Sequence, residues 1–131
     1  MKILTLIARI LLGLIFTVFG LNGFLNFMPP PPTGIPQGAM DFSIAMMKTG
    51  YFVQLVSGTQ MVCGLLLLLG RFVPLALTVL APMLVNIVAF HLFLFPSGLV
   101  IPIVIVGLEL FLAFAYRNAF RPMLQAKAMP A

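Results

Sequence analysis

The sequence predicts an all-α membrane protein, an antiparallel bundle of four transmembrane helices formed by one domain over residues 1–131. Hydrophobic residues make up 63% of the chain and charged residues only 7%, whereas a soluble domain carries about 25% charged residues. The apolar residues form long runs, and about 20 residues at 1.5 Å rise cross roughly 30 Å of hydrocarbon. Backbone in lipid must pair its own polar groups, which allows helices or closed barrels. The runs lack the alternation of barrel strands, so helices are predicted.

The four helices are expected over residues 3–27, 51–69, 74–95 and 99–116. The first run follows Lys2 but is longer than a signal-peptide core and has no A-x-A site, so we expect it to be retained. Small residues recur on one face of this helix, where they allow another helix to approach closely. The face contains Arg9, Gly13, Phe16, Gly20 and Gly23.

Residues 28–50 are expected on the extracytoplasmic side. Five of the residues in 28–38 are prolines, which fix φ and lack a donor, so this part is predicted to be an extended loop. Residues 39–49 are predicted to be a short amphipathic segment along the membrane surface. The alternative is that they form the first turns of a long second helix. The basic tail, 117–131, is expected to be featureless.

The second and third helices are joined by a tight turn that contains Gly70 and Arg71, which makes them an antiparallel hairpin. Pro74 follows the turn, and proline is favoured in the first turn of a helix. Pro82 is expected to kink the third helix, with Thr78 as a partner for a freed backbone group.

The positive-inside rule predicts that both termini are cytoplasmic. Six basic residues then lie at or near the cytoplasmic side and one, Lys48, lies outside. The six are Lys2, Arg9, Arg71, Arg117, Arg121 and Lys127.

Two ionisable residues, Arg9 and Glu109, lie within the predicted spans, where such groups are costly and indicate function. Their depths from the cytoplasmic end are about 9 and 12 Å, so they can meet as an ion pair that closes the bundle. A second interpretation makes Glu109 a proton or ligand site. In a third, Arg9 extends to the headgroups and Glu109 is protonated or faces water.

The remaining candidates for an intramembrane polar or ligand site are neutral side chains and one histidine. Gln60 and Asn86 fall at middle depth, near the level of Glu109, where amides join helices more often than they bind ligands. His91, Asn22 and Gln54 lie near the outer end, where a polar pocket can open. His91 is about 140° around its helix from Asn86, which argues against one narrow site for both.

Several kinds of chemistry are not expected. Cys63 is alone, so a disulfide or CxxC redox pair within the chain is excluded. Ligands are too few for a bis-histidine haem or a di-iron centre. The basic residues lie at helix ends rather than in a nucleic-acid-binding patch, and no catalytic motif is present. We expect no catalytic residue, no metal and no cofactor held by this chain, although a quinone is compatible with the pocket.

The sequence resembles the DoxX and DoxX-like small membrane proteins. The resemblance lies in ARILLGLIF at residues 8–16, FGLNGF at 19–24, GLLLLLGRFVPLAL at 64–77, LAP at 80–82, Asn86 and Phe90-His91. Many relatives carry a glutamate before the Gly-Leu-Leu-Leu run, where this sequence has Gln60-Met61.

The resemblance implies a four-helix protein of the prokaryotic inner membrane. The family is named after a subunit of an archaeal thiosulfate:quinone oxidoreductase, which implies a non-catalytic accessory or anchoring subunit in a membrane redox process. Its partners would be lipid and either other membrane subunits or further copies of itself. The alternatives are a binder or transporter of a small molecule, lipid or quinone that uses the polar midplane, and a quinone-reactive subunit that depends on a redox partner chain.

Overall fold

The computed structural model describes residues 2–25 and 34–130, and this part of the chain contains helices and no strands. Three helices, α1, α3 and α4, are long and apolar enough to cross a membrane, and α5 is a shorter apolar helix of 16 residues. The prediction of an all-helical membrane protein is therefore confirmed. The elements are α1 (Lys2–Leu25), α2 (Gln37–Lys48), α3 (Phe52–Leu69), α4 (Val73–Phe93), η1 (Pro96–Gly98), α5 (Val100–Ala115) and α6 (Arg117–Phe120).

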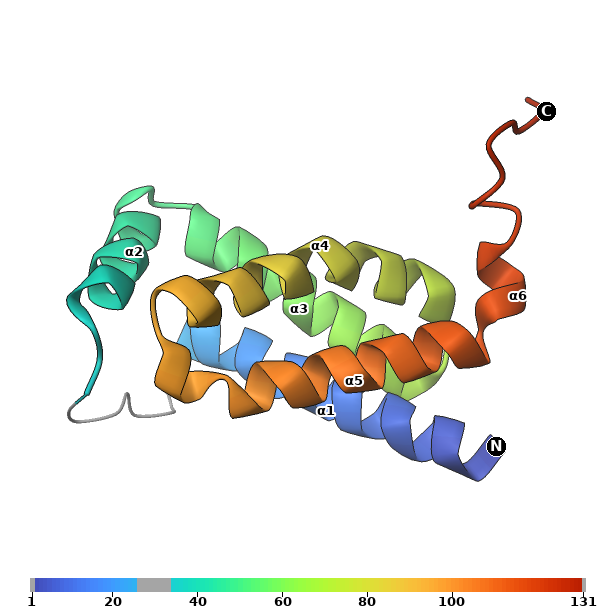
Figure 1. Ribbon diagram of the computed structural model, residues 1–131, viewed down its shortest axis with the longest axis horizontal. Helices are drawn as coiled ribbons and strands as arrows, with labels where there is room; N and C mark the ends of the chain where they lie inside the picture. The colour runs from blue at the N-terminus through green and yellow to red at the C-terminus, as the bar shows by residue number, and fades with distance from the viewer. Residues whose placement is uncertain (1, 26–33, 131) are drawn as a thin grey trace.

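The four longest apolar helices form a closed ring. Helix α1 packs on α3, α3 on α4, α4 on α5, and α5 returns to α1 (Figure 1). Helix α2 stands across one end of this bundle, while both ends of the chain and α6 lie at the other end.

The structure has a separate helix, α2, at Gln37–Lys48, close to the short segment predicted over residues 39–49. Helix α2 is separate from α3, so the alternative of one long second helix is wrong. The Thr49 hydroxyl explains the break, because it donates to Met46 O at 2.8 Å and accepts from the Phe52 N–H at 3.0 Å. Gly50 then turns the chain with a φ of 82°. Residues 28–33 of the predicted proline loop, 28–38, lie outside the described residues, and its last two residues belong to α2.

The tail is not featureless, because it begins with the one-turn helix α6. Arg117 fixes this turn to the end of α5. Its Nη1 donates to Phe114 O at 3.0 Å, and its guanidinium lies 4.6 Å from the centre of the Phe114 ring.

The hairpin between α3 and α4 is confirmed. Gly70 has a φ of 72°, which glycine adopts without steric cost, and its N–H donates to Leu67 O at 3.3 Å. Pro82 lies inside α4, where it leaves the Thr78 carbonyl without a donor. The Thr78 hydroxyl does not compensate for this, because it donates to Pro74 O at 2.8 Å.

Backbone contact through glycines joins α1 to α3. A Cβ added at Gly64 would lie 2.6 Å from Thr17 N and 2.8 Å from Gly13 O, and one added at Gly20 would lie 2.6 Å from Ser57 O. No side chain larger than hydrogen fits at these distances. The glycine face predicted on the first helix is thus the face that packs against α3, as expected for close approach in lipid.

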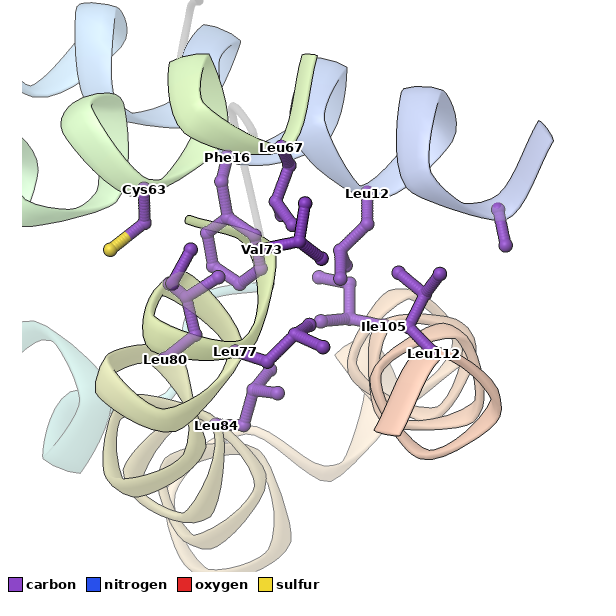
Figure 2. Close-up of a cluster of buried hydrophobic side chains, with 12 residues drawn as sticks. Leu12, Phe16, Cys63, Leu67, Val73, Leu77, Leu80, Leu84, Ile105 and Leu112 are labelled. Atoms are coloured by element: carbon purple, nitrogen blue, oxygen red, sulfur yellow. The ribbon is translucent and has the colours of Figure 1, made fainter. Parts of the chain in front are cut away.

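A small hydrophobic core fills the centre of the ring. Phe16 and Leu12 from α1 meet Leu77 from α4 and Ile105 from α5, and all four are nearly inaccessible (Figure 2). Most other large apolar side chains face outward, as expected when lipid surrounds the bundle.

Gly64→Ala is expected to destabilise the bundle by about 1–3 kcal/mol, because the added methyl group would meet backbone atoms of α1 and force the helices apart. Thermal unfolding in detergent, followed by circular dichroism, measures the loss. Gly107→Ala is the matched control, since a Cβ at Gly107 meets nothing within 4 Å. Equal melting temperatures for the two variants would contradict the packing described here.

Candidate functional site

A pocket of about 500 Å³ lies between α2, α3 and α4. We call it the α2 pocket. Its wall is mainly apolar and aromatic, with a few polar side chains. It is lined by Phe42, Ser43 and Met46 from α2, Phe52, Val56 and Gln60 from α3, and Pro82, Met83, Asn86, Ile87, Phe90 and His91 from α4.

Gln60, Asn86 and His91 all line the α2 pocket. The angular argument against a shared site for Asn86 and His91 therefore does not hold for a pocket of this width, because the pocket follows more than one face of α4. Among the described residues, the structure gives Gln60 and Asn86 no hydrogen-bond partner, and each amide can donate two hydrogen bonds.

His91 is fixed by its neighbours. Its Nδ1 lies 2.9 Å from Ile87 O. A carbonyl only accepts, so Nδ1 is the donor in this bond. The ring packs edge-on against Phe90 and lies close to Phe95 and Gly98. His91 thus joins the end of α4 to η1 as well as lining the pocket.

Helix α2 covers the pocket. The Phe42 ring lies 5.3 Å from the Phe90 ring, and Gly38 packs close to Leu94 of the α4–η1 connection. Sequence reasoning missed Phe42, Ser43 and Met46 as pocket residues. The only signal was the amphipathic pattern of this segment, which predicts an apolar face without saying what that face covers.

Arg9 and Glu109 do not form an ion pair, although both are described and lie at comparable depth. Arg9 Nε and Glu109 Oε1 are each buried without a hydrogen-bond partner. The Arg9 guanidinium packs against Gly70 in the α3–α4 turn and lines a notch with Lys2 and Tyr116. This position agrees with the interpretation in which Arg9 extends toward the end of the bundle.

Glu109, Gln54 and Asn22 do not line the α2 pocket. Glu109 is buried on α5 and faces a groove between α4 and α5. Gln54 lines a different groove, on the outer side of α3 and α4. Asn22 is half-buried on α1. The seven candidate residues are therefore divided among several places, and only three of them share one pocket.

Comparison with protein-family models matches residues 4–92 of this chain to DoxX. The chain belongs to the DoxX family. Searches of curated proteins and of solved structures found no match. Together with the apolar helices, membership in DoxX establishes a multi-pass integral membrane protein.

The DoxX match includes the α3 and α4 residues of the α2 pocket and ends at Leu92. Helix α5, with Glu109, lies beyond it. The α2 pocket is thus built within the DoxX part of the chain, whereas the groove at Glu109 combines that part with a helix outside the match. In residues 2–25 and 34–130, no group of three or more His, Cys, Asp or Glu side chains is placed to hold a metal ion.

The losses of stability in Arg9→Gln and Glu109→Gln are expected to add within about 0.5 kcal/mol in the double variant, because the two side chains do not interact. Thermal unfolding of the three variants and the parent in one detergent gives the coupling energy. If the double variant lost clearly less stability than the sum of the two single losses, the difference would reveal an ion pair and contradict the observed geometry.

Proposed function

We propose that this protein binds a membrane quinone in the α2 pocket and acts as a non-catalytic accessory subunit of a membrane redox system. The observation that carries the quinone site is the convergence in one pocket with aromatic walls of two amides, Gln60 and Asn86, that have no hydrogen-bond partner among the described residues.

The two amides need a partner. Gln60 is half-buried and Asn86 is exposed on the surface of the bundle, where lipid offers no strong hydrogen bonds and an amide in apolar surroundings without one is disfavoured. Amides between membrane helices commonly bond one another, but the structure records no such bond for Gln60 or Asn86 among the described residues. A ligand with acceptor oxygens would supply the missing partners.

A quinone headgroup has the matching chemistry. Its carbonyl oxygens accept hydrogen bonds, which the amide N–H groups of Gln60 and Asn86 can donate. Its flat ring suits the aromatic walls formed by Phe42, Phe52 and Phe90. Ligand pockets typically have volumes of about 300–1,000 Å³, and the α2 pocket has about 500 Å³. The apolar surroundings suit an isoprenoid tail.

The accessory role rests on the sequence and on the DoxX resemblance. The chain has one cysteine and one histidine, so it has no CxxC pair and no bis-histidine haem site. A quinone held here would exchange electrons with a partner chain that carries its own redox centre. Binding alone, for transport or storage of the quinone, is the alternative.

We further propose that α5 is a fourth span and that both termini are cytoplasmic in the inner membrane of a prokaryote. The 16 residues of α5 cover about 24 Å at 1.5 Å each, and Arg117 at its end can reach the headgroups. The same end of the bundle carries both termini and the Arg71 turn, while Lys48 lies on α2 at the other end (Figure 1). This distribution favours a cytoplasmic location for the first end.

Gln60→Leu and Asn86→Leu are each expected to weaken quinone binding about three- to tenfold, the effect of one lost hydrogen bond. Titration of the protein in quinone-free nanodiscs with ubiquinone-2 and menaquinone-4, by calorimetry, measures the dissociation constants. Gln54→Leu is the matched control, because Gln54 lines another groove and should leave binding unchanged.

If Gln60→Leu, Asn86→Leu and Gln54→Leu all bind quinone with the same affinity, the α2 pocket is not the quinone site. If the parent protein binds no quinone, the proposed function is contradicted. Preparation in a mild native detergent also tests the accessory role through the mass of the particle. A redox subunit should co-purify, whereas a single chain with quinone bound would favour the binding alternative.

The proposed orientation predicts opposite labelling of two cysteines introduced in a Cys63→Ser background. Ser97→Cys in η1 should react with an impermeant maleimide in intact spheroplasts, and Arg121→Cys should react only after the membrane is opened, because both positions are exposed at opposite ends of the bundle. The reverse pattern would overturn the orientation.

A further inference from the structure

A second cavity, of about 560 Å³, lies between α4 and α5 and is bounded at one end by the segment that follows α5. We call it the Glu109 groove. Aliphatic side chains form most of its wall, and Phe120 and Met123 bound it at the end. It is separate from the α2 pocket, because the two cavities use different residues of α4.

Glu109 is the charged residue of this groove. The side chain is only 8% exposed, and its Oε1 is buried without a hydrogen-bond partner. The second polar group of the wall is the Thr78 hydroxyl, which already donates to Pro74 O. The groove therefore contains one unsatisfied carboxyl group in apolar surroundings.

Nothing in the described part of the chain neutralises this carboxyl group. Arg9 of α1 packs against Gly70 and forms no salt bridge with Glu109. Cys63 of α3 is buried as a free thiol and offers no positive charge. The groove residues of α4, α5 and the segment after α5 include no basic side chain.

The geometry points to a binding site for a lipophilic monovalent cation, with the Glu109 carboxylate as its counter-charge. An isolated carboxylate in apolar surroundings is strongly disfavoured, whereas a carboxylate paired with a cation forms a neutral contact. One acidic group is balanced by one positive charge on the ligand, and the aliphatic walls suit a ligand whose remaining surface is apolar. A lipophilic amine or phosphonium of drug size has both properties and suits a cavity of this volume.

The same carboxyl oxygen cannot hold a proton and a cation at once. Binding of the cation therefore competes with protonation of Glu109, and affinity should fall as the pH is lowered. The thiol of Cys63 is replaced in a Cys63→Ser control, which removes a titratable side chain of the neighbouring helix α3.

Calorimetric titration of the protein in nanodiscs of zwitterionic lipid with tetraphenylphosphonium tests the proposal. The parent is expected to bind the cation, Glu109→Gln to bind it at least tenfold more weakly, and Cys63→Ser to bind it like the parent. Triphenylphosphine, a neutral probe with three of the same phenyl rings, should bind the parent and Glu109→Gln alike.

Val85→Phe is a second variant, which tests the groove independently if Glu109→Gln fails to fold. Val85 lines the groove but is 70% exposed, so a larger side chain there narrows the cavity without entering the core. It should weaken binding of the cation while Glu109 is retained. Equal binding of the cation by the parent and Glu109→Gln, or an unchanged affinity between pH 8 and pH 5, would overturn the proposal. Failure of quinone binding in the α2 pocket would not bear on it.

Discussion

In a bilayer the hydrophobic effect does not press helices together, so a bundle needs surfaces that fit closely. Here that fit is the backbone contact of α1 with α3 at Gly13, Gly20 and Gly64. Phe16 of α1 enters the core of the bundle (Figure 2). The contact also fixes the rotation of α3, and with it the direction in which Gln60 points. The α2 pocket therefore depends on an interface whose glycines do not line it.

Helix α4 separates the two cavities of this protein. Residues such as Asn86 and Phe90 line the α2 pocket, while Thr78 and Val85 line the Glu109 groove. Helix α2 covers the first cavity, and the segment after α5 bounds one end of the second. A DoxX match that ends at Leu92 includes the residues of the first cavity on α3 and α4, but only the α4 side of the second.

The length and apolar character of the runs were enough to predict the helices, and Gly70 and Pro74 were enough to predict the hairpin. The break between α2 and α3 depends on the side-chain bonds of Thr49, which the pattern of hydrophobic residues does not report. Depth along a helix brought Arg9 and Glu109 to one level, but depth does not fix rotation, and the two side chains point to different surroundings. The positions of Asn86 and His91 along and around α4 also gave no indication that one pocket is wide enough to include both.

The side chains that shape the Glu109 groove are largely different from those that hold the bundle together. Val85 and Leu110 are 70% and 64% exposed, whereas Leu80 and Ile105, on the same two helices, are almost completely inaccessible and do not line the groove. Substitutions in the first pair change the shape offered to a ligand and leave the core intact. The cation preference proposed for the groove can therefore be altered at its exposed wall without disturbing the core of the bundle.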